Sequence, residues 1–315
     1  MPAPTLLDIQ RIAPGTRDLF ELQIARLPTH TAIELPIFVY KGLEAGPGLL
    51  VTAGLHGDEI NGIEIIRRMI RNQQLMPDRG LVIAIPVVNI FGFIHSSRRL
   101  PEGKDLNRSF PGTSKGSLSS QVANVLMTRV VPLCQAVVDL HTGGGSKFNC
   151  PQVRCDFSVP DARSLARSFG ARCIVHSKPP DQSFRKEVSK RNIACVTYEG
   201  GESMRLDEDA IQVGLSGVRR VLKHLNMQNN DQDEAGPRPE YPKTSWIRAP
   251  HTGIFNARVT PGQLVSRSHI VGVVADPFGE REIVVKAKTK GLVIGVNHRC
   301  VIHRGEALVH LGVTS

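Results

Sequence analysis

The sequence predicts an α/β layered domain followed by a smaller all-β domain, and two observations predict it. Up to about residue 230, short and almost continuously apolar segments alternate with helical patterns, which indicates buried strands flanked by helices. Beyond that point the helical patterns vanish, and short Val- and Ile-rich runs follow one another between Gly and Pro-Gly breaks. We therefore expect an α/β domain over residues 1–230 and a C-terminal β domain over residues 243–315, in the form of a compact barrel or a sandwich.

The elements of the α/β part follow from their patterns. We expect buried strands at 48–53, 81–88, 136–140 and 193–198, all rich in Val and Ile. Apolar residues recur at helical spacing in 60–70, 122–131, 162–169 and 207–225. The last of these begins with acidic residues, which favour a helix N-terminus. The polar, proline-containing stretch 226–242 is expected to be a linker or an exposed loop.

The C-terminal part contains six short apolar runs. They lie at 253–259, 263–265, 270–274, 282–286, 292–296 and 307–311. Short strands at such close spacing are typical of a small all-β domain.

Composition limits the classes of partner. The formal net charge is +10, but the basic residues are spread along the chain and aromatic residues make up only 5%, so we do not expect a nucleic-acid partner. A basic solvated surface, together with arginines that hold an anionic substrate, accounts for the positive net charge. No apolar run approaches the ~20 residues that span a bilayer, so no membrane partner is expected. The sequence leaves the oligomeric state open, a homo-oligomer included.

The six cysteines and the first residues bear on localisation. None of the cysteines forms a C-x-x-C pair, and the start MPAPTLLDIQ lacks the pattern of a secretion signal. Scattered thiols in such a chain are typical of a reduced, cytoplasmic protein.

The strongest chemical signal is the segment TAGLHGDE at residues 52–59. A buried strand runs into Gly54, and His56 and Glu59 follow where a helix should begin. Ligands of open α/β sheets bind outside the carboxyl ends of strands, so these two metal-type ligands are well placed. Gly54 and Gly57 permit the tight backbone that this requires.

A third ligand is expected from another strand end. His141 follows the apolar run AVVDL and precedes glycines. Two histidines and a glutamate form a catalytic zinc set with a fourth position open, and Asp139 is placed to orient an imidazole. The sequence therefore predicts a catalytic Zn²⁺ site, which would make residues 1–230 a zinc hydrolase catalytic domain.

A second signal is the Gly- and Pro-rich stretch that contains Arg98-Arg99 and, further on, DLNRSFPG at 105–112. Asn107 and Arg108 together suit bidentate capture of a carboxylate. Either Arg98 or Arg99 could polarise the scissile carbonyl and stabilise the oxyanion that forms. Without a metal site nearby, these arginines would be read as solvated surface charge.

A third signal is TYEGGE at 197–202, where an apolar strand again ends in a carboxylate and glycines. Glu199 is the expected general base for zinc-bound water. Glu202 is a nearby rival, and Glu199 is preferred because it lies at the strand end itself.

Together, GLHGDE, DLNRSFPG, DLHTGG and YEGG resemble the succinylglutamate desuccinylase/aspartoacylase family of the zinc carboxypeptidase-like superfamily, over roughly residues 45–220. The resemblance implies a phosphorylase/hydrolase-like mixed sheet flanked by helices, one zinc ion and an appended C-terminal β-barrel-like domain. It also implies hydrolysis of an N-acyl amino acid or a related amide.

The resemblance also implies roles for individual residues. His56, Glu59 and His141 look like the zinc ligands, and Glu199 looks like the base. Arg98 looks like the carbonyl-polarising arginine, although the neighbouring Arg99 leaves that open.

The substrate end is less well defined by the resemblance. Asn107 and Arg108 look like the pair that holds a substrate carboxylate or carbonyl. Family members select the amino-acid part with further arginines and a late tyrosine that we cannot match here. Arg185 is a candidate for such an arginine, but a solvated surface charge explains it at least as well. Tyr198 is expected to point into the core.

These observations favour a deacylase in which zinc-bound water attacks the amide of a small N-acyl substrate. The alternative is a metallocarboxypeptidase that acts on peptides and shares the same zinc set and base. A non-enzymatic zinc-binding protein is disfavoured, because binding a metal requires neither Glu199 nor Arg98.

Overall fold

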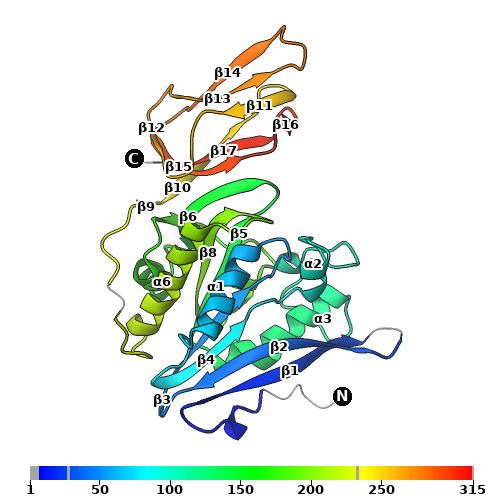
Figure 1. Ribbon diagram of the computed structural model, residues 1–315, viewed down its shortest axis with the longest axis vertical. Coiled ribbons are helices and arrows are strands. Elements are labelled where there is room, and N and C mark those ends of the chain that lie inside the picture. Colours follow the sequence, from blue (N-terminus) through cyan, green and yellow to red (C-terminus); the bar gives the residue numbers. More distant parts are fainter. Residues whose placement is uncertain (1–6, 27–28, 232–233, 314–315) are drawn as a thin grey trace.

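The structure is a computed structural model that describes residues 7–26, 29–231 and 234–313. A large mixed sheet runs through the molecule, and a second, smaller antiparallel sheet lies at its C-terminal end (Figure 1). The large sheet has the order β1-β2-β4-β3-β5-β8-β6-β15-β17-β10, and the small sheet has the order β14-β13-β11-β16.

The first part contains the strands β1 (Thr16–Arg26), β2 (Ala32–Lys41), β3 (Glu44–Ala53), β4 (Arg79–Ile85), β5 (Ala136–Gly143), β6 (Lys147–Cys155), β7 (Cys173–His176) and β8 (Ala194–Glu202). Its helices are α1 (Ile60–Arg71), α2 (Ile90–Ile94), α3 (Leu118–Val125), α4 (Pro160–Phe169), α5 (Phe184–Ser189) and α6 (Glu208–His224). Single helical turns lie at Ile9–Arg11, Leu106–Arg108, Leu126–Val130 and Val131–Leu133.

The second part contains only strands among the described residues. They are β9 (Glu240–Tyr241), β10 (Lys243–Arg248), β11 (Gly253–Ala257), β12 (Leu264–Val265), β13 (Ile270–Ala275), β14 (Glu282–Lys286), β15 (Gly291–Asn297), β16 (Val301–Ile302) and β17 (Ala307–Val313).

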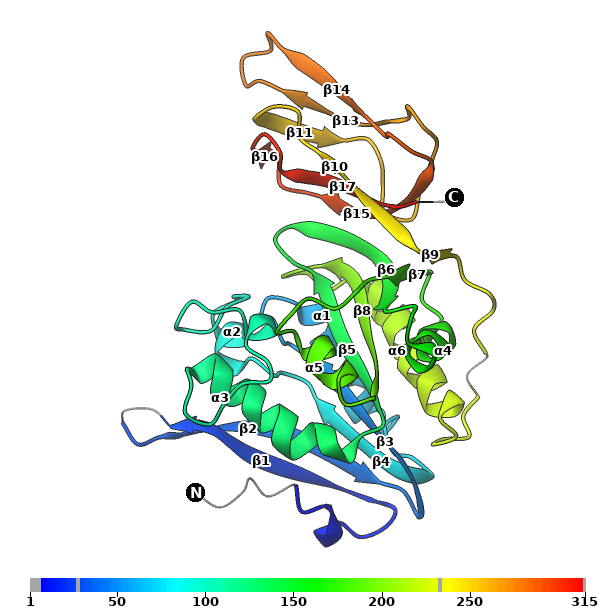
Figure 2. The same cartoon turned by 180° about the vertical axis from the view of Figure 1, so that it is seen from behind.

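The centre of the large sheet is a parallel set, β4-β3-β5-β8, that is covered on both faces. Helices α1, α4 and α6 lie on one face and α3 and α5 on the other (Figures 1 and 2). Alternate side chains serve the two layers: Leu49 and Val51 pack with α1 and α6, whereas Leu50 packs with α3 and α5. Burial on both faces explains why these strands are apolar almost without a break.

The predicted α/β architecture is confirmed, with differences at strand ends. The helices predicted at 60–70, 162–169 and 207–225 match α1, α4 and α6, and the helix predicted at 122–131 begins earlier and continues as a wider turn. Strands β5 and β8 extend beyond their predicted ends to include His141 and Glu199. Backbone pairing does not need apolar side chains, so it continues past the apolar runs.

An N-terminal antiparallel hairpin of β1 and β2 was not predicted. The two strands pair with each other, and β2 continues the sheet next to β4. In β1, Phe20, Leu22 and Ile24 are buried, whereas Leu19, Glu21 and Gln23 are exposed. This two-residue alternation is the signal that could have revealed the strand.

The C-terminal strands join the large sheet through β15, which pairs antiparallel with β6. Strands β17 and β10 continue the same sheet, and the four-stranded sheet packs with it around a separate apolar core. The two-sheet, all-β character of this part is confirmed, while the barrel-like closure and the domain boundaries stay predictions. In the predicted linker, residues 232–233 lie outside the described part.

Two further expectations concern cysteines and membranes. All six cysteines are free, and only Cys300 is exposed. Within the described ranges, no helix is long and apolar enough to cross a membrane. The expectation about a secretion signal falls largely on residues 1–6, which are outside those ranges.

Candidate active site

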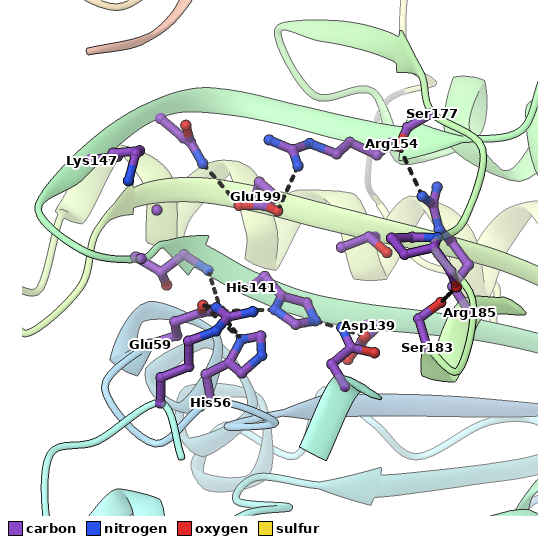
Figure 3. A pocket seen from close by; sticks show the side chains of 18 of the residues that line it. His56, Glu59, Asp139, His141, Lys147, Arg154, Ser177, Ser183, Arg185 and Glu199 are labelled. Carbon is purple, nitrogen blue, oxygen red and sulfur yellow. Dashed lines mark hydrogen bonds and ion pairs between the residues drawn. The ribbon is translucent and has the colours of Figure 1, made fainter. Parts of the chain in front are cut away.

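One small cavity gathers the predicted chemical groups at the carboxyl ends of the central strands. Its volume is about 290 Å³. The predicted residues that line it are His56, Glu59, Arg98, Asn107, Arg108, Asp139, His141, Arg185 and Glu199. Most of them are labelled in Figure 3. The position agrees with the rule that open α/β sheets bind ligands beyond the carboxyl ends of their strands.

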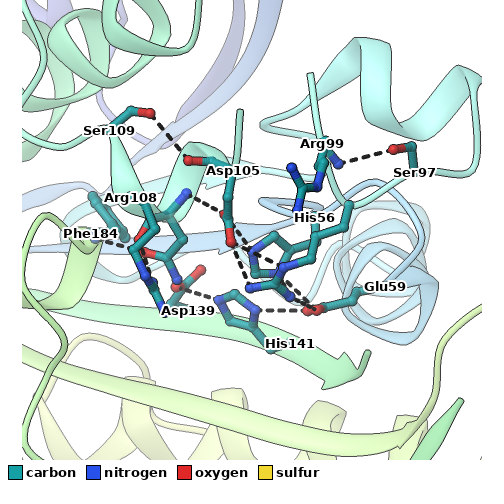
Figure 4. A network of polar contacts seen from close by, with 12 residues as sticks. His56, Glu59, Ser97, Arg99, Asp105, Arg108, Ser109, Asp139, His141 and Phe184 are labelled. Atoms are coloured by element: carbon teal, nitrogen blue, oxygen red, sulfur yellow. Dashed lines mark hydrogen bonds and ion pairs between the residues drawn. The ribbon is translucent and has the colours of Figure 1, made fainter. Parts of the chain in front are cut away.

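Three buried side chains, His56, Glu59 and His141, converge at the floor of this cavity (Figure 4). Nδ1 of His56 lies 2.8 Å from Oε1 of Glu59, and Nδ1 of His141 lies 2.7 Å from Oε2. One potential ligand atom from each residue lies within 4.8 Å of the others. Two imidazole nitrogens and one carboxylate form the donor set of a catalytic zinc site.

The turn after β3 brings His56 and Glu59 together. Gly54 has a φ of +61°, a left-handed conformation that favours glycine. A Cβ on Gly57 would lie 1.8 Å from the carbonyl carbon of Gly92, so only glycine fits between this turn and α2. Glu59 is the residue that precedes α1, which directs its carboxylate toward the end of β5.

Each histidine is held on its other ring nitrogen by a carboxylate. Oδ2 of Asp139 lies 2.7 Å from Nε2 of His141, and its other oxygen accepts a hydrogen bond from Thr52. Oδ1 of Asp105 lies 3.2 Å from Nε2 of His56. Such partners orient metal-ligating imidazoles. The contact of Asp139 was predicted; that of Asp105, the first residue of DLNR, was missed.

The electrostatics of the three side chains favour bound positive charge. Burial lowers the pKa of His141, but the carboxylates of Asp139 and Glu59 outweigh it and raise that pKa well above its ordinary value. Burial raises the pKa of Glu59, whereas His56 and His141 outweigh it and hold that pKa well below its ordinary value. The donor set is one that Zn²⁺ uses, and the carboxylates of Glu59, Asp105 and Asp139 around the two imidazoles supply negative charge that a divalent cation would offset.

Replacing Asp139 by asparagine is expected to weaken metal binding about 10- to 100-fold, because the amide orients the imidazole of His141 less strongly than the carboxylate does. Competition with a chelator of known affinity measures this. Asp231→Asn is the matched control, since the side chain of Asp231 is 90% exposed. Equal metal affinity of Asp139→Asn and the control would contradict the orienting role.

The structure distinguishes the two neighbouring arginines. The guanidinium of Arg98 lies in the cavity, with Nη1 3.2 Å from Nδ1 of His56 and 3.4 Å from Oε1 of Glu59. Its Nε and Nη2 also contact Oδ2 of Asp105, at 3.1 and 3.0 Å, and this pairing fixes its orientation. Arg99 is exposed and donates to the carbonyl of Gly103 outside the cavity. Of the pair, only Arg98 can reach a group bound beside the three candidate ligands.

Glu199 lies next to His141, because the two are register partners in the parallel pair β5 and β8. Asn149 donates to its Oε2 at 2.8 Å, and Nη1 of Arg154 lies 3.2 Å from its Oε1 (Figure 3). Both partners come from β6 and were not predicted. The rival Glu202 pairs with His298 and does not line the cavity.

The other end of the cavity is basic. Arg185 is only 7% exposed, so the reading of Arg185 as a solvated surface charge is wrong. Its Nη2 donates to Ser177, whereas its buried Nη1 has no partner among the described residues. Arg108 is exposed at the rim, and the side-chain oxygen of Asn107 accepts from the backbone N–H of Phe184.

Tyr198 lies in the core, as predicted. Its ring stacks on Phe169, and its hydroxyl donates to the carbonyl of Ala210. No tyrosine lines the cavity among the residues that the structure describes; the indole there is that of Trp246.

The fold and the grouped side chains define a mixed α/β protein with a buried group that could hold a metal ion. A family model for the succinylglutamate desuccinylase/aspartoacylase catalytic domain matches residues 45–225, which is more than half of the chain. The chain belongs to the succinylglutamate desuccinylase/aspartoacylase family, as the motifs predicted.

Individual relatives cover nearly the whole chain. The N-alpha-acetyl-L-2,4-diaminobutyric acid deacetylase of Halomonas elongata is 25% identical over 291 residues, covering 88% of this chain and 85% of its own. The crystal structure of a succinylglutamate desuccinylase/aspartoacylase from Rhodobacter sphaeroides has a TM-score of 0.85 at 25% identity, covering 98% of this chain and 99% of its own.

A third relative extends the likeness of the fold. The product-bound ectoine utilization protein EutE (DoeB) from Ruegeria pomeroyi has a TM-score of 0.87 at 22% identity, and the match covers 100% of both chains. At that identity the likeness concerns the fold alone.

Proposed function

We propose that this chain is a zinc-dependent deacylase that hydrolyses the amide bond of small N-acyl amino acids or related N-acyl amines. One observation carries the proposal: the His56–Glu59–His141 group, Arg98 and Glu199 line the same cavity. The name of the Halomonas relative, a deacetylase of an N-acetylated amino acid, supports the reaction class.

In this proposal His56, Glu59 and His141 hold the metal. A bound Zn²⁺ supplies Lewis acidity, which lowers the pKa of a water molecule and polarises an amide carbonyl. All three side chains line the cavity, so a water molecule and the substrate carbonyl would both reach a metal ion held there.

Glu199 moves the proton. It accepts a proton from the attacking water and later donates it to the nitrogen of the leaving amine. Asn149 and Arg154 each occupy one lone pair on different oxygens of the carboxylate, so each oxygen keeps a lone pair for the proton. These two contacts hold Glu199 beside His141 and set its direction.

Arg98 stabilises the negative charge that develops on the carbonyl oxygen. Its guanidinium is fixed in advance by Asp105, so it needs no reorganisation during the reaction. Arg98→Ala is expected to lower kcat about 10²- to 10³-fold.

Arg99→Ala is the matched control for this prediction, because Arg99 lies outside the cavity. Steady-state kinetics on both variants, with metal content measured in parallel, tests the assignment. A larger loss of kcat in Arg99→Ala than in Arg98→Ala would reverse it.

The basic end of the cavity accounts for an anionic substrate. Arg185 presents a buried guanidinium nitrogen without a partner among the described residues, and Lys147 and Arg108 lie on the same lining. The carboxylates that line the cavity already have partners: Glu59 and Asp139 contact His141, and Glu199 contacts Arg154. We assign Arg185, with Asn107 and Arg108, to the carboxylate of the substrate.

The cavity also bears on the alternative of a peptide-trimming metallocarboxypeptidase. A volume of about 290 Å³ is at the small end for ligand pockets, and Trp246 of the C-terminal part adds a large side chain to the lining. Both features favour a small substrate over a chain. We assign residues 1–230 to the catalytic domain and 243–315 to a C-terminal β domain that narrows the site.

A screen of N-acetyl, N-formyl and N-succinyl amino acids against unblocked di- and tripeptides tests the function. The zinc-loaded protein is expected to release free amine from one class of N-acyl amino acid with a higher kcat/KM than from any peptide. Faster release of C-terminal residues from peptides would favour the carboxypeptidase. No release from any substrate by the zinc-loaded protein would contradict both.

A further inference from the structure

Trp246 lies in β10, far along the chain from the other residues of the site. It is the only residue beyond Glu199, within the described ranges, that lines the cavity. It is also the single tryptophan of the chain. The C-terminal part therefore contributes one large aromatic surface to a cavity that is otherwise mostly polar and charged.

The sheet register connects Trp246 to the base. Strands β6, β15, β17 and β10 lie side by side in this order. Asn149 of β6 is opposite Gly295 of β15, Gly295 is opposite His310 of β17, and His310 is opposite Trp246 of β10. Side chains of directly opposed residues in antiparallel strands lie on the same face. This row therefore runs on one face of the sheet from Asn149, which holds Glu199, to Trp246.

The indole has a fixed orientation because His310 supports it. The two ring planes are 3° from parallel, and their centroids are 4.1 Å apart. His310 is 6% exposed, and neither ring nitrogen has a partner among the described residues. Burial, with Arg154 nearby, lowers the pKa of His310 to about 3, so the supporting ring is neutral.

One face of the indole is thus covered by an imidazole, and the surface left to the cavity is its edge or its opposite face. The cationic side chains of Arg98, Arg154, Arg185 and Lys147 line the cavity, and apart from Trp246 the lining includes few apolar side chains. An indole with a fixed orientation favours a flat unsaturated group, through edge-to-face or offset stacking.

We propose that Trp246 is a specificity-determining residue that packs against an aromatic ring in the acyl or the amino-acid part of the substrate. This rests on the proposed deacylase function for the identity of the substrate. The preferred substrates are then N-acyl amino acids in which one of the two parts carries such a ring.

The single tryptophan allows a test that does not depend on hydrolysis. Metal-free wild-type protein is titrated with two pairs of ligands of equal charge: N-benzoylglycine against N-acetylglycine, and N-acetyl-L-phenylalanine against N-acetyl-L-alanine. In at least one pair, the aromatic member is expected to bind about tenfold more tightly in calorimetry and to change the tryptophan emission. The proposal would be overturned if neither aromatic ligand bound more tightly than its aliphatic partner, which includes the case in which no ligand binds. It would also be overturned if an aromatic ligand bound more tightly without changing the tryptophan emission.

Variants of the zinc-loaded protein separate contact from a structural role. Trp246→Ala is expected to lower the ratio of kcat/KM for the aromatic over the aliphatic member about tenfold, and Trp246→Phe to keep most of it. Phe278→Ala is the control, since Phe278 is 83% exposed on a distant turn. An equal loss on both members in Trp246→Ala would show a merely structural role.

The two failures are distinguishable. If the zinc-loaded protein hydrolyses none of the four ligands, the deacylase function is contradicted for these substrates. Calorimetry and emission on the metal-free protein still decide whether Trp246 contacts the ring.

Discussion

Replacing His141 by alanine is expected to abolish metal binding and hydrolysis together. The imidazole is buried, contributes one of three candidate ligand atoms and cannot be replaced by another described side chain in the group. Because a catalytic metal contributes several kcal/mol to transition-state stabilisation and about 1.4 kcal/mol is a factor of ten, kcat/KM should fall about a thousandfold or more. Metal content after dialysis and the rate of amine release measure both effects.

The deletion leaves the carboxylates of Asp139 and Glu59 buried without their histidine partner, so the variant can also lose stability. Glu59→Gln keeps the shape of the ligand and serves as a second variant, with circular dichroism as the check on folding. His224→Ala is the control outside the cavity. A folded His141→Ala protein that binds one zinc ion tightly and retains its rate would contradict the assignment of the ligands.

Replacing Glu199 by glutamine is expected to leave the metal bound and to remove most of the activity. Glutamine keeps the size of the side chain and an oxygen for Asn149, but it cannot accept the proton. General acid–base catalysis contributes about 10²- to 10⁴-fold, so kcat should fall by that factor while KM changes little. Single-turnover rates and metal content measured on the same sample test this.

Glu202→Gln is the matched control for the base. Glu202 lies three residues further along β8, pairs with His298 and does not line the cavity. Its replacement should change kcat by less than the replacement of Glu199 does. If Glu199→Gln left every hydrolytic activity unchanged with zinc bound, the proposed mechanism would be wrong.

The sequence predicts the central layers well because local patterns determine them. The helical spacing of apolar residues in α1, α4 and α6 and the continuous apolar runs of β3 and β5 follow directly from burial. Strand β6 was missed because its sequence, KFNCPQVRC, mixes polar residues and a proline into a buried strand. Its position between β8 and β15 depends on tertiary pairing, which no local pattern records.

The contrast between local sequence patterns and tertiary strand pairing also applies to the residues of the site. His56, Glu59 and His141 could be predicted because each lies at the end of a recognisable apolar strand or in the turn after it, and the structure brings them together. Asn149, Arg154 and Trp246 could not be predicted, because they reach the cavity only through the pairing of β6 and the C-terminal strands with the central sheet.

Removal and restoration of zinc test the central claim most directly. The purified protein is stripped with a chelator, assayed on the best N-acyl amino acid from the screen, and titrated with Zn²⁺ while bound metal and amine release are followed together. The account predicts that activity is lost with the metal and returns in proportion to occupancy, saturating at one zinc ion per chain. Full hydrolysis by the stripped protein, or tight binding of one zinc ion per chain with no hydrolysis of any N-acyl substrate, would contradict it.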